Sequence, residues 1–256
     1  MIKLTARFAL RTAARNSIVG LALLVAIWFI LAQFFPDYIL PSPVAVLSTV
    51  PTYLDQAFAH DLLLTGYRVV VGFAIAFLAG TALGITAFML HLTEFLNSFM
   101  VALQVIPGVI LGIIFLLVLG IGSWVPIALV ALLTLPTIAI NTANGLAKRS
   151  VALEQYLLSA GGSRRHLVKH LYVPALIPTF QSNLSLGFGL SLKVVILGEF
   201  IGAQAGIGYL LNVAAIHFNM KAVLFYLGVA LLATALFEVG QSLVFGMFLG
   251  KYFYPE

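Results

Sequence analysis

Long apolar runs, separated by short polar segments, dominate the chain and predict helices that cross a membrane. A spanning helix needs about 20 mostly apolar residues. Residues 18–35, 69–90, 97–119, 124–147, 171–198 and 222–250 approach or exceed that length. No run alternates in polarity at every second residue, as the strands of a membrane barrel would. We therefore predict an all-α, polytopic membrane protein with about six transmembrane helices.

Two of these boundaries need a separate argument. The uncharged run 95–147 is too long for one crossing, and Gly120, Gly122 and Pro126 place a turn in its middle, so it is read as two spans. The first run follows a basic tail, as in a cleaved signal peptide. However, it exceeds the usual length of about 7–15 residues, and no small-x-small site precedes Pro36. We expect an uncleaved first span.

The positive charges predict the orientation of these helices. Ten basic residues fall in segments that six crossings place on one side, whereas only Lys221 lies in the segments of the other side. The rule that cytoplasmic loops are enriched in Lys and Arg makes the basic side cytoplasmic, together with the N- and C-termini. The ten are Lys3, Arg7, Arg11, Arg15, Lys148, Arg149, Arg164, Arg165, Lys169 and Lys251.

The composition excludes several other classes of protein. Hydrophobic residues make up 62% of the 256 residues and charged residues 8%, whereas soluble domains carry about 25% charged residues. The net charge of +5 rests on too few basic residues to follow a nucleic-acid backbone. Because cysteine is absent, the chain has no disulfide framework, no thiolate nucleophile and no metal site with cysteine ligands. We therefore expect the protein to lie in a lipid bilayer and not to bind nucleic acid.

Two connecting segments are longer than a simple turn requires. Residues 44–58 read as a short interfacial helix, bent at Pro51. Residues 150–172 read as an amphipathic helix up to Ala160, a break at Gly161-Gly162, and a second helix that starts at Ser163 and enters the membrane at Pro174. The exposed apolar side chains of the second segment favour a docking surface. An interfacial helix pair on anionic lipid explains them equally well.

The spacing in this second segment resembles the EAA loop of the membrane subunits of bacterial ABC importers, E-A-A-x3-G-x9-I-x-L-P. The front end departs from the pattern, because Gln155, Tyr156 and Leu157 replace Glu-Ala-Ala, and Glu154 lies one place early. The remaining positions match in type and spacing, with 13 residues from the glycine to the proline; they are Gly161, Leu171, Val173 and Pro174.

Further short motifs resemble the nitrate, sulfonate and taurine branch of these importers. They extend from about residue 20 to 250 and follow one another in the order in which that branch has them. The chain is therefore read as a single permease domain over residues 1–256. The motifs are Leu40-Pro41-Ser42-Pro43, residues 63–73, Ile106-Pro107 with Leu119-Gly120-Ile121-Gly122, Asn141-Thr142-x-x-Gly145, Leu197-Gly198-Glu199 and Gly206-Ile207-Gly208-Tyr209.

The resemblance implies a type I ABC importer fold and a permease subunit in the bacterial inner membrane. Two copies would pair around a pathway, each bound to an ATPase, with a periplasmic binding protein delivering a small solute. That solute would be an anion such as a sulfonate, taurine, nitrate or bicarbonate. The residues implied in ATPase coupling are Glu154, Gln155, Ala160, Gly161, Gly162, Arg164 and Pro174.

The chain itself carries none of the motifs that ATP binding or catalysis would need. It has no G-x-x-x-x-G-K-[S/T] loop, so ATP and Mg²⁺ are expected on the partner ATPase, and no cofactor or metal on this chain. H-E-x-x-H and G-x-S-x-G are also absent, which disfavours a membrane enzyme. A stand-alone secondary transporter or channel stays as the alternative, although no internal repeat is evident.

Four ionisable residues fall at membrane depth, where they are costly unless they face water or a partner. Arg68 is expected to extend its side chain to the nearer interface. Lys193 is either a cation along an anion pathway or the partner of a carboxylate on another span. It is not expected to pair with Glu199, six residues on, because the two lie on different helix faces. Pro107 and Glu199 complete the pathway candidates, and Glu238 is expected in helix packing.

Overall fold

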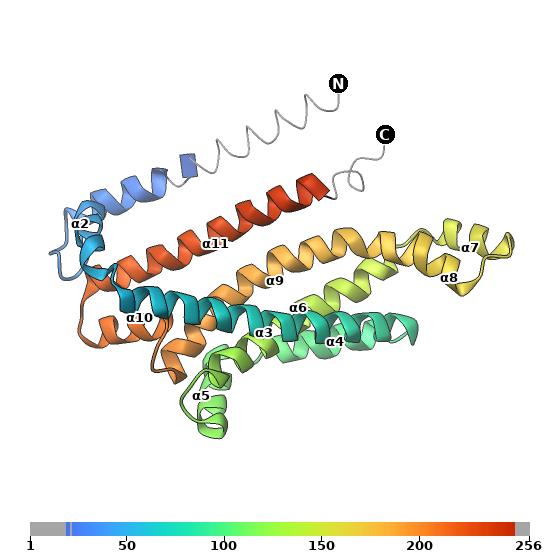
Figure 1. Ribbon diagram of the computed structural model, residues 1–256, viewed down its shortest axis with the longest axis horizontal. Coiled ribbons are helices and arrows are strands. Elements are labelled where there is room, and N and C mark those ends of the chain that lie inside the picture. The colour runs from blue at the N-terminus through green and yellow to red at the C-terminus, as the bar shows by residue number, and fades with distance from the viewer. Residues whose placement is uncertain (1–18, 21, 249–256) are drawn as a thin grey trace.

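The computed structural model describes residues 19, 20 and 22–248, and every regular element in these residues is a helix (Figure 1). A short helical segment that includes Ala22–Ala32 comes first. The helices that follow are α2 (Pro43–Tyr53), α3 (Gln56–Met89), α4 (Thr93–Gln104), α5 (Gly108–Leu119), α6 (Trp124–Ala147), α7 (Val151–Ser159), α8 (Arg164–Leu167), a π-helix (Val168–Tyr172), α9 (Val173–Gly202), α10 (Ile207–Ile216) and α11 (Met220–Phe248).

Four helical stretches are long and apolar enough to cross a membrane, which confirms four of the predicted spans. They are α3, α6, the run Arg164–Gly202 that ends with α9, and the α11 segment Met220–Gln241. The first predicted span starts at residue 18, outside the described residues, and its Ala22–Ala32 part is shorter than a span. The fold class is therefore an all-α membrane protein, as predicted.

The third predicted span is not one straight helix. Residues 97–119 divide between α4 and α5, whose axes differ by 80° across the break at Val105–Pro107. Pro107 has extended backbone angles (φ −61°, ψ 128°) and precedes the first residue of α5. A proline cannot donate a backbone hydrogen bond and disfavours helical angles in the residue before it. Run length alone does not show this break, because residues 97–119 carry no charged side chain.

Helices α3, α6 and α9 pack closely against each other at the centre of the bundle. A Cβ at Gly80 would lie 2.9 Å from the Leu135 oxygen of α6, and one at Gly84 would lie 2.7 Å from the Ala139 oxygen. On the other side, a Cβ at Gly198 of α9 would lie 2.5 Å from the Pro126 Cα. Glycines at these positions let the helix backbones approach each other, as small residues do in membrane bundles.

The short helix after the first span ends earlier than predicted. Residues 44–58 were expected to form one helix, but α2 ends at Tyr53 and α3 begins at Gln56. Asp55 explains the boundary, because its carboxylate accepts the backbone N–H of Phe58 at 2.7 Å and so caps α3. The Tyr53 ring stacks on Phe225, which packs α2 against α11.

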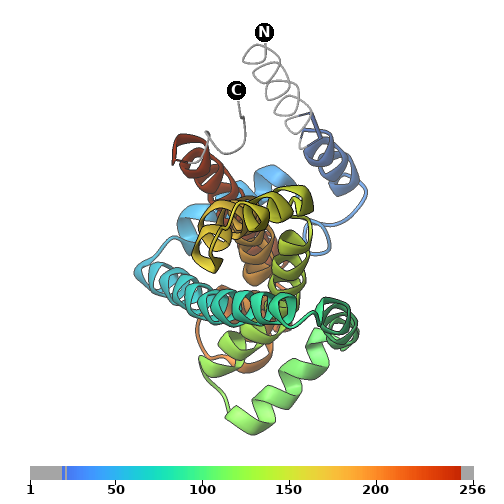
Figure 2. The same ribbon diagram turned by 90° about the vertical axis from the view of Figure 1, so that its right-hand side faces the viewer.

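The two ends of the bundle differ in construction. Helices α7 and α8 project beyond the long helices at one end, here called the α7 end, whereas α2 and α10 lie at the opposite end, called the α10 end (Figure 1). Figure 2 shows α5 turned away from the other helices after the α4–α5 break. Each end carries a polar network, and a cleft lies between α9 and α11.

Candidate functional site

The 150–172 segment forms the helix–turn–helix that the sequence predicts. Ser150 caps α7 by accepting the Leu153 N–H at 3.2 Å, and α7 ends at Ser159. Gly161 has φ +78°, a left-handed conformation that costs a side chain about 1–2 kcal/mol. The Gly162 N–H then bonds the Leu157 oxygen at 2.8 Å, which closes the turn before α8. The turn therefore requires glycine at position 161.

The apolar side chains of α7 have little to pack against in the described part of the chain. No residue of α7 is buried. An apolar patch that is exposed in a single chain commonly marks a surface that another protein or a lipid covers. The exposed apolar residues are Val151, Leu153, Tyr156 and Leu158.

Polar contacts of Glu154 with Arg149 and Tyr172, here called the Glu154 brace, connect α7 to the helices of the bundle. Glu154 accepts the Nε–H of Arg149 at 2.8 Å through one carboxylate oxygen and the Tyr172 hydroxyl at 2.8 Å through the other. The Arg149 guanidinium also lies over the Phe88 ring of α3, 4.7 Å from its centre. Glu154 therefore points inward and fixes the position of α7. The roles of Arg149 and Tyr172 were not predicted from the sequence.

The other predicted coupling residues follow the surface of the turn. Four of them are exposed, whereas Gly162 and Pro174 are half-buried. Because these four exposed residues are open to solvent, a partner protein could contact them. They are Gln155, Ala160, Gly161 and Arg164.

Pro174 does not interrupt the helix that enters the bundle. The run from Arg164 to Gly202 is continuous, and a π-helix at Val168–Tyr172 joins α8 to α9. The Val173 N–H bonds the Val168 oxygen, one residue further back than in an α-helix. The wider π turn accommodates a proline that cannot donate to the preceding turn. The structure therefore joins α8 to α9 without a break in the helix.

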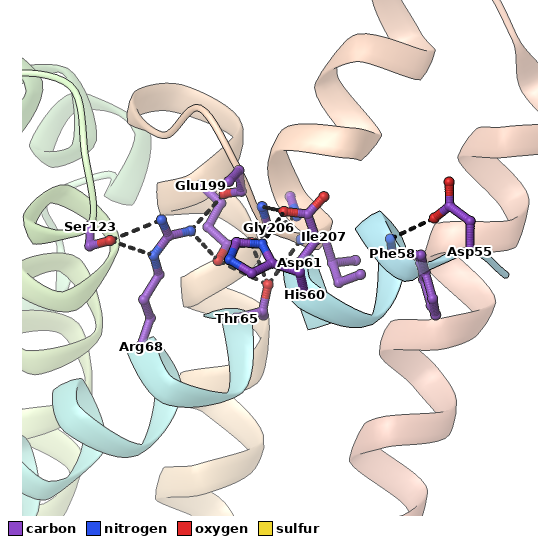
Figure 3. A network of polar contacts seen from close by, with 12 residues as sticks. Asp55, Phe58, His60, Asp61, Thr65, Arg68, Ser123, Glu199, Gly206 and Ile207 are labelled. Atoms are coloured by element: carbon purple, nitrogen blue, oxygen red, sulfur yellow. Dashed lines mark hydrogen bonds and ion pairs between the residues drawn. The ribbon is translucent and has the colours of Figure 1, made fainter. Parts of the chain in front are cut away.

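At the α10 end, Arg68 and Glu199 form a buried ion pair (Figure 3). Arg68 Nη1 lies 2.7 Å from Glu199 Oε1, and the side chains are 3% and 0% exposed. The guanidinium also donates to Ser123 Oγ, at 3.1 and 3.0 Å, and to the Ala205 carbonyl at 2.7 Å. The expectation that Arg68 reaches the interface is wrong, because three acceptors hold it inside the protein.

The same carboxylate holds the start of α10. The Gly208 N–H donates to Glu199 Oε2 at 2.9 Å, the Ile207 N–H to Thr65 Oγ1 at 2.9 Å, and the Gly206 N–H to Asp61 Oδ1 at 2.8 Å. A helix N-terminus has unpaired N–H groups and a partial positive charge, so carboxylates stabilise it.

This Arg68–Glu199 network therefore joins α3, α9, α10 and the turn before α6 at one point, as Figure 3 shows. It brings together three of the separate sequence motifs, those at residues 63–73, 197–199 and 206–209. The Glu199 carboxylate is enclosed by these contacts, so its predicted role along a pathway stays a prediction.

A cleft of about 580 Å³ lies between α9 and α11, here called the α9–α11 cleft. Most of its lining residues are polar, although they belong to helices that are long and apolar enough to span a membrane. Glu238 is exposed in this cleft rather than enclosed by helix packing. The lining residues are Pro178, Gln181, Ser182, Ser185, Leu186, Glu238 and Gln241.

Two further pathway candidates are also exposed. Lys193 lies on α9, eight residues beyond Ser185, and Pro107 lies at the α4–α5 break. Within residues 22–241, none of the ion pairs involves Lys193 or Glu238. Both charges are therefore available to water, to another chain or to a solute.

Long apolar helices that carry charged side chains, together with a helix at one end whose apolar side chains are exposed, are features of membrane transport subunits. The chain belongs to the family of binding-protein-dependent transport system inner membrane components, whose profile matches residues 72–245. This confirms the resemblance to ABC importer permeases. Permeases of this family work with an ATPase and a periplasmic binding protein.

Individual relatives agree with this assignment. The chain is 30% identical over 189 residues to the formylaminopyrimidine transport permease ThiX of Halalkalibacterium halodurans, covering 73% of this chain and 76% of that protein. It is 23% identical over 243 residues to the taurine transport system permease TauC of Escherichia coli, covering 91% and 88%. Its fold matches a chain of the MetNI methionine ABC transporter with a TM-score of 0.64 at 17% identity, covering 73% and 94%.

Proposed function

We propose that the chain forms one half of the translocation pathway of an ATP-driven importer, and that a second copy forms the other half. The α9–α11 cleft is the observation that carries this proposal. It places Glu238 and several amides and hydroxyls at membrane depth on the outside of a single chain. Because a charge that faces lipid costs about 2.5–3.5 kcal/mol or more, this face is expected to meet water and another copy.

The 150–172 segment is the proposed docking site for one ATPase per permease copy. Its α7 side chains are exposed, and the Glu154 brace holds α7 against the bundle. The continuous helix from Arg164 to Gly202 provides the mechanical link, because it runs from the docking site along the cleft. ATP and Mg²⁺ bind on the ATPases, and their closure displaces α8 and with it α9. The coupling energy comes from the different affinities of the ATPase states for the segment.

The proposed orientation places the α7 end in the cytoplasm of a bacterium, together with both chain termini. Lys148, Arg149 and the other basic residues of the segment support it. The α10 end then faces the periplasm, where a binding protein delivers the solute. The Arg68–Glu199 network would give that end a rigid surface.

The solute is proposed to be small and polar, with an anionic group that can approach Lys193. An exposed ammonium inside an apolar span supports this choice. The two curated relatives described above are named for different solutes, formylaminopyrimidine and taurine.

Cross-linking tests the proposed pairing, because the chain has no cysteine of its own. A single thiol at Leu186, which lines the cleft and is 58% exposed, should give a covalent dimer with a short bifunctional maleimide in membranes. Leu78→Cys on α3, at 70% exposure, is the matched control and should stay monomeric. Equal yields from the two variants, or none from Leu186→Cys, would contradict pairing across this face.

A further inference from the structure

Among the described residues that line the α9–α11 cleft, Glu238 is the only charged one. The other polar groups of these residues are amides and hydroxyls, and none of these residues is basic. Gln241 also lines this cleft, and its buried Oε1 atom has no hydrogen-bond partner among the described residues. The cleft therefore presents the exposed carboxylate of Glu238, and its described lining residues include no cation to pair with it.

The carboxylates of Glu199 and Glu238 differ in their hydrogen-bond partners. Glu199 is fully buried, but it accepts hydrogen bonds from Arg68, Thr65 and Gly208. Glu238 has no comparable partner in the described part of the chain. A carboxylate at membrane depth needs a cation, a hydrogen-bond donor or water beside it. The natural complement to this cleft is a group that brings donors.

The cleft also lies at a different depth from Lys193. Eight residues of α9 separate Ser185 from Lys193, which is about 12 Å along a helix. The rings of Phe188 and Phe237 stack between α9 and α11 with their centres 3.6 Å apart, and Phe237 immediately precedes Glu238. A solute that moves along α9 thus meets the ammonium and the carboxylate one after the other.

We propose that the α9–α11 cleft binds the N–H donor group of the transported solute, an ammonium, amidine or amino-heterocycle. This inference rests on the proposed function and deepens it. The solute is then dipolar, with an acceptor or anionic part for Lys193 and a donor part for Glu238. A simple inorganic anion such as nitrate or bicarbonate has no donor part of this kind and does not fit.

Charged thiol reagents test the electrostatic part of the proposal in the assembled transporter. In Ser185→Cys, a cationic and an anionic methanethiosulfonate of similar size compete for the only thiol in the chain. Their rates are normalised to those with a free thiol in solution. We expect the cationic reagent to react about tenfold faster, which corresponds to a difference of about 1.4 kcal/mol. Adding Glu238→Gln should bring the ratio close to one.

Two controls separate the possible outcomes. Glu94→Gln removes an exposed carboxylate from the start of α4 and should leave the ratio unchanged. Ser163→Cys in the exposed 150–172 segment should react with water-soluble reagents in any case. If Ser163→Cys reacts and Ser185→Cys does not, the cleft is not a water-filled pathway and the proposed function fails. If Ser185→Cys reacts without a charge preference, or with one that Glu238→Gln does not change, the pathway stands and the donor site is refuted.

Discussion

Replacing Arg68 by methionine should strongly destabilise the protein, because it leaves the Glu199 carboxylate buried without a cation. The substitution removes the 2.7 Å ion pair, the donation to Ala205 and both donations to Ser123. Glu199 would keep only its bonds from Thr65 and Gly208. Breaking a buried pair by removing one partner costs about 3–5 kcal/mol.

The structure indicates which part of this cost is electrostatic. Methionine fills much of the volume of the arginine side chain, so a large cavity is not expected. Arg68→Lys keeps the positive charge but cannot reach Glu199, Ser123 and Ala205 together, because lysine lacks the planar fork of donors. We expect Arg68→Lys to lose roughly half as much stability as Arg68→Met.

Thermal denaturation of the purified protein in one detergent measures the effect, followed by fluorescence-detected size exclusion. For domains of this size, about 1 kcal/mol shifts the melting temperature by about 2–4 °C, so Arg68→Met should lower it by about 6–20 °C. Arg165→Met, which removes an exposed arginine without an ion pair in the described structure, is the matched control and should melt like the parent protein.

The double variant Arg68→Met/Glu199→Gln decides the interpretation. Neutral replacements of a buried pair are often nearly isoenergetic with the pair, so the second change should restore most of the lost stability. A melting temperature for Arg68→Met within about 2 °C of the parent would refute the reasoning, because that shift is worth only about 1 kcal/mol. So would a double variant that is no more stable than the single one.

Three further predictions concern the α7 end and the pathway. Gly161→Val should insert into the membrane normally but weaken ATPase retention and abolish uptake, because valine strains the left-handed turn by about 1–2 kcal/mol. Pull-down of the ATPase and uptake assays measure these effects, and Ser159→Val is the control that should keep both ATPase retention and uptake. Ser163→Cys should react with an impermeant maleimide in inverted vesicles only, and labelling in intact spheroplasts would reverse the orientation. Lys193→Met should fold with normal yield, since Lys193 has no ion pair among the described residues, but should slow uptake; unchanged uptake by the folded variant would remove its pathway role.

The sequence predicted those features of the fold that depend on local patterns. Apolar run length is sufficient to locate α3, α6, α9 and α11, because a bilayer requires about 20 apolar residues of each spanning helix. It does not give the helix ends, since α3 begins at Gln56, well before the predicted run 69–90. The turn at Gly161 was also predictable, since glycine is the residue that adopts a left-handed angle at low cost. The apolar run alone does not show how sharply the chain bends before α5, because residues 97–119 carry no charge and proline is tolerated in many spanning helices.

The polar contacts were less predictable, because they join residues that lie far apart in the chain. Arg68 and Glu199 are 131 residues apart, and each alone is consistent with a side chain that reaches the interface. One signal was present: both lie near the α10 ends of their spans, so opposite charges at equal depth could have been paired. The same test gives no partner for Lys193 or Glu238. Charges at depth that find no partner within the chain are the ones expected to act on a second copy or on the solute.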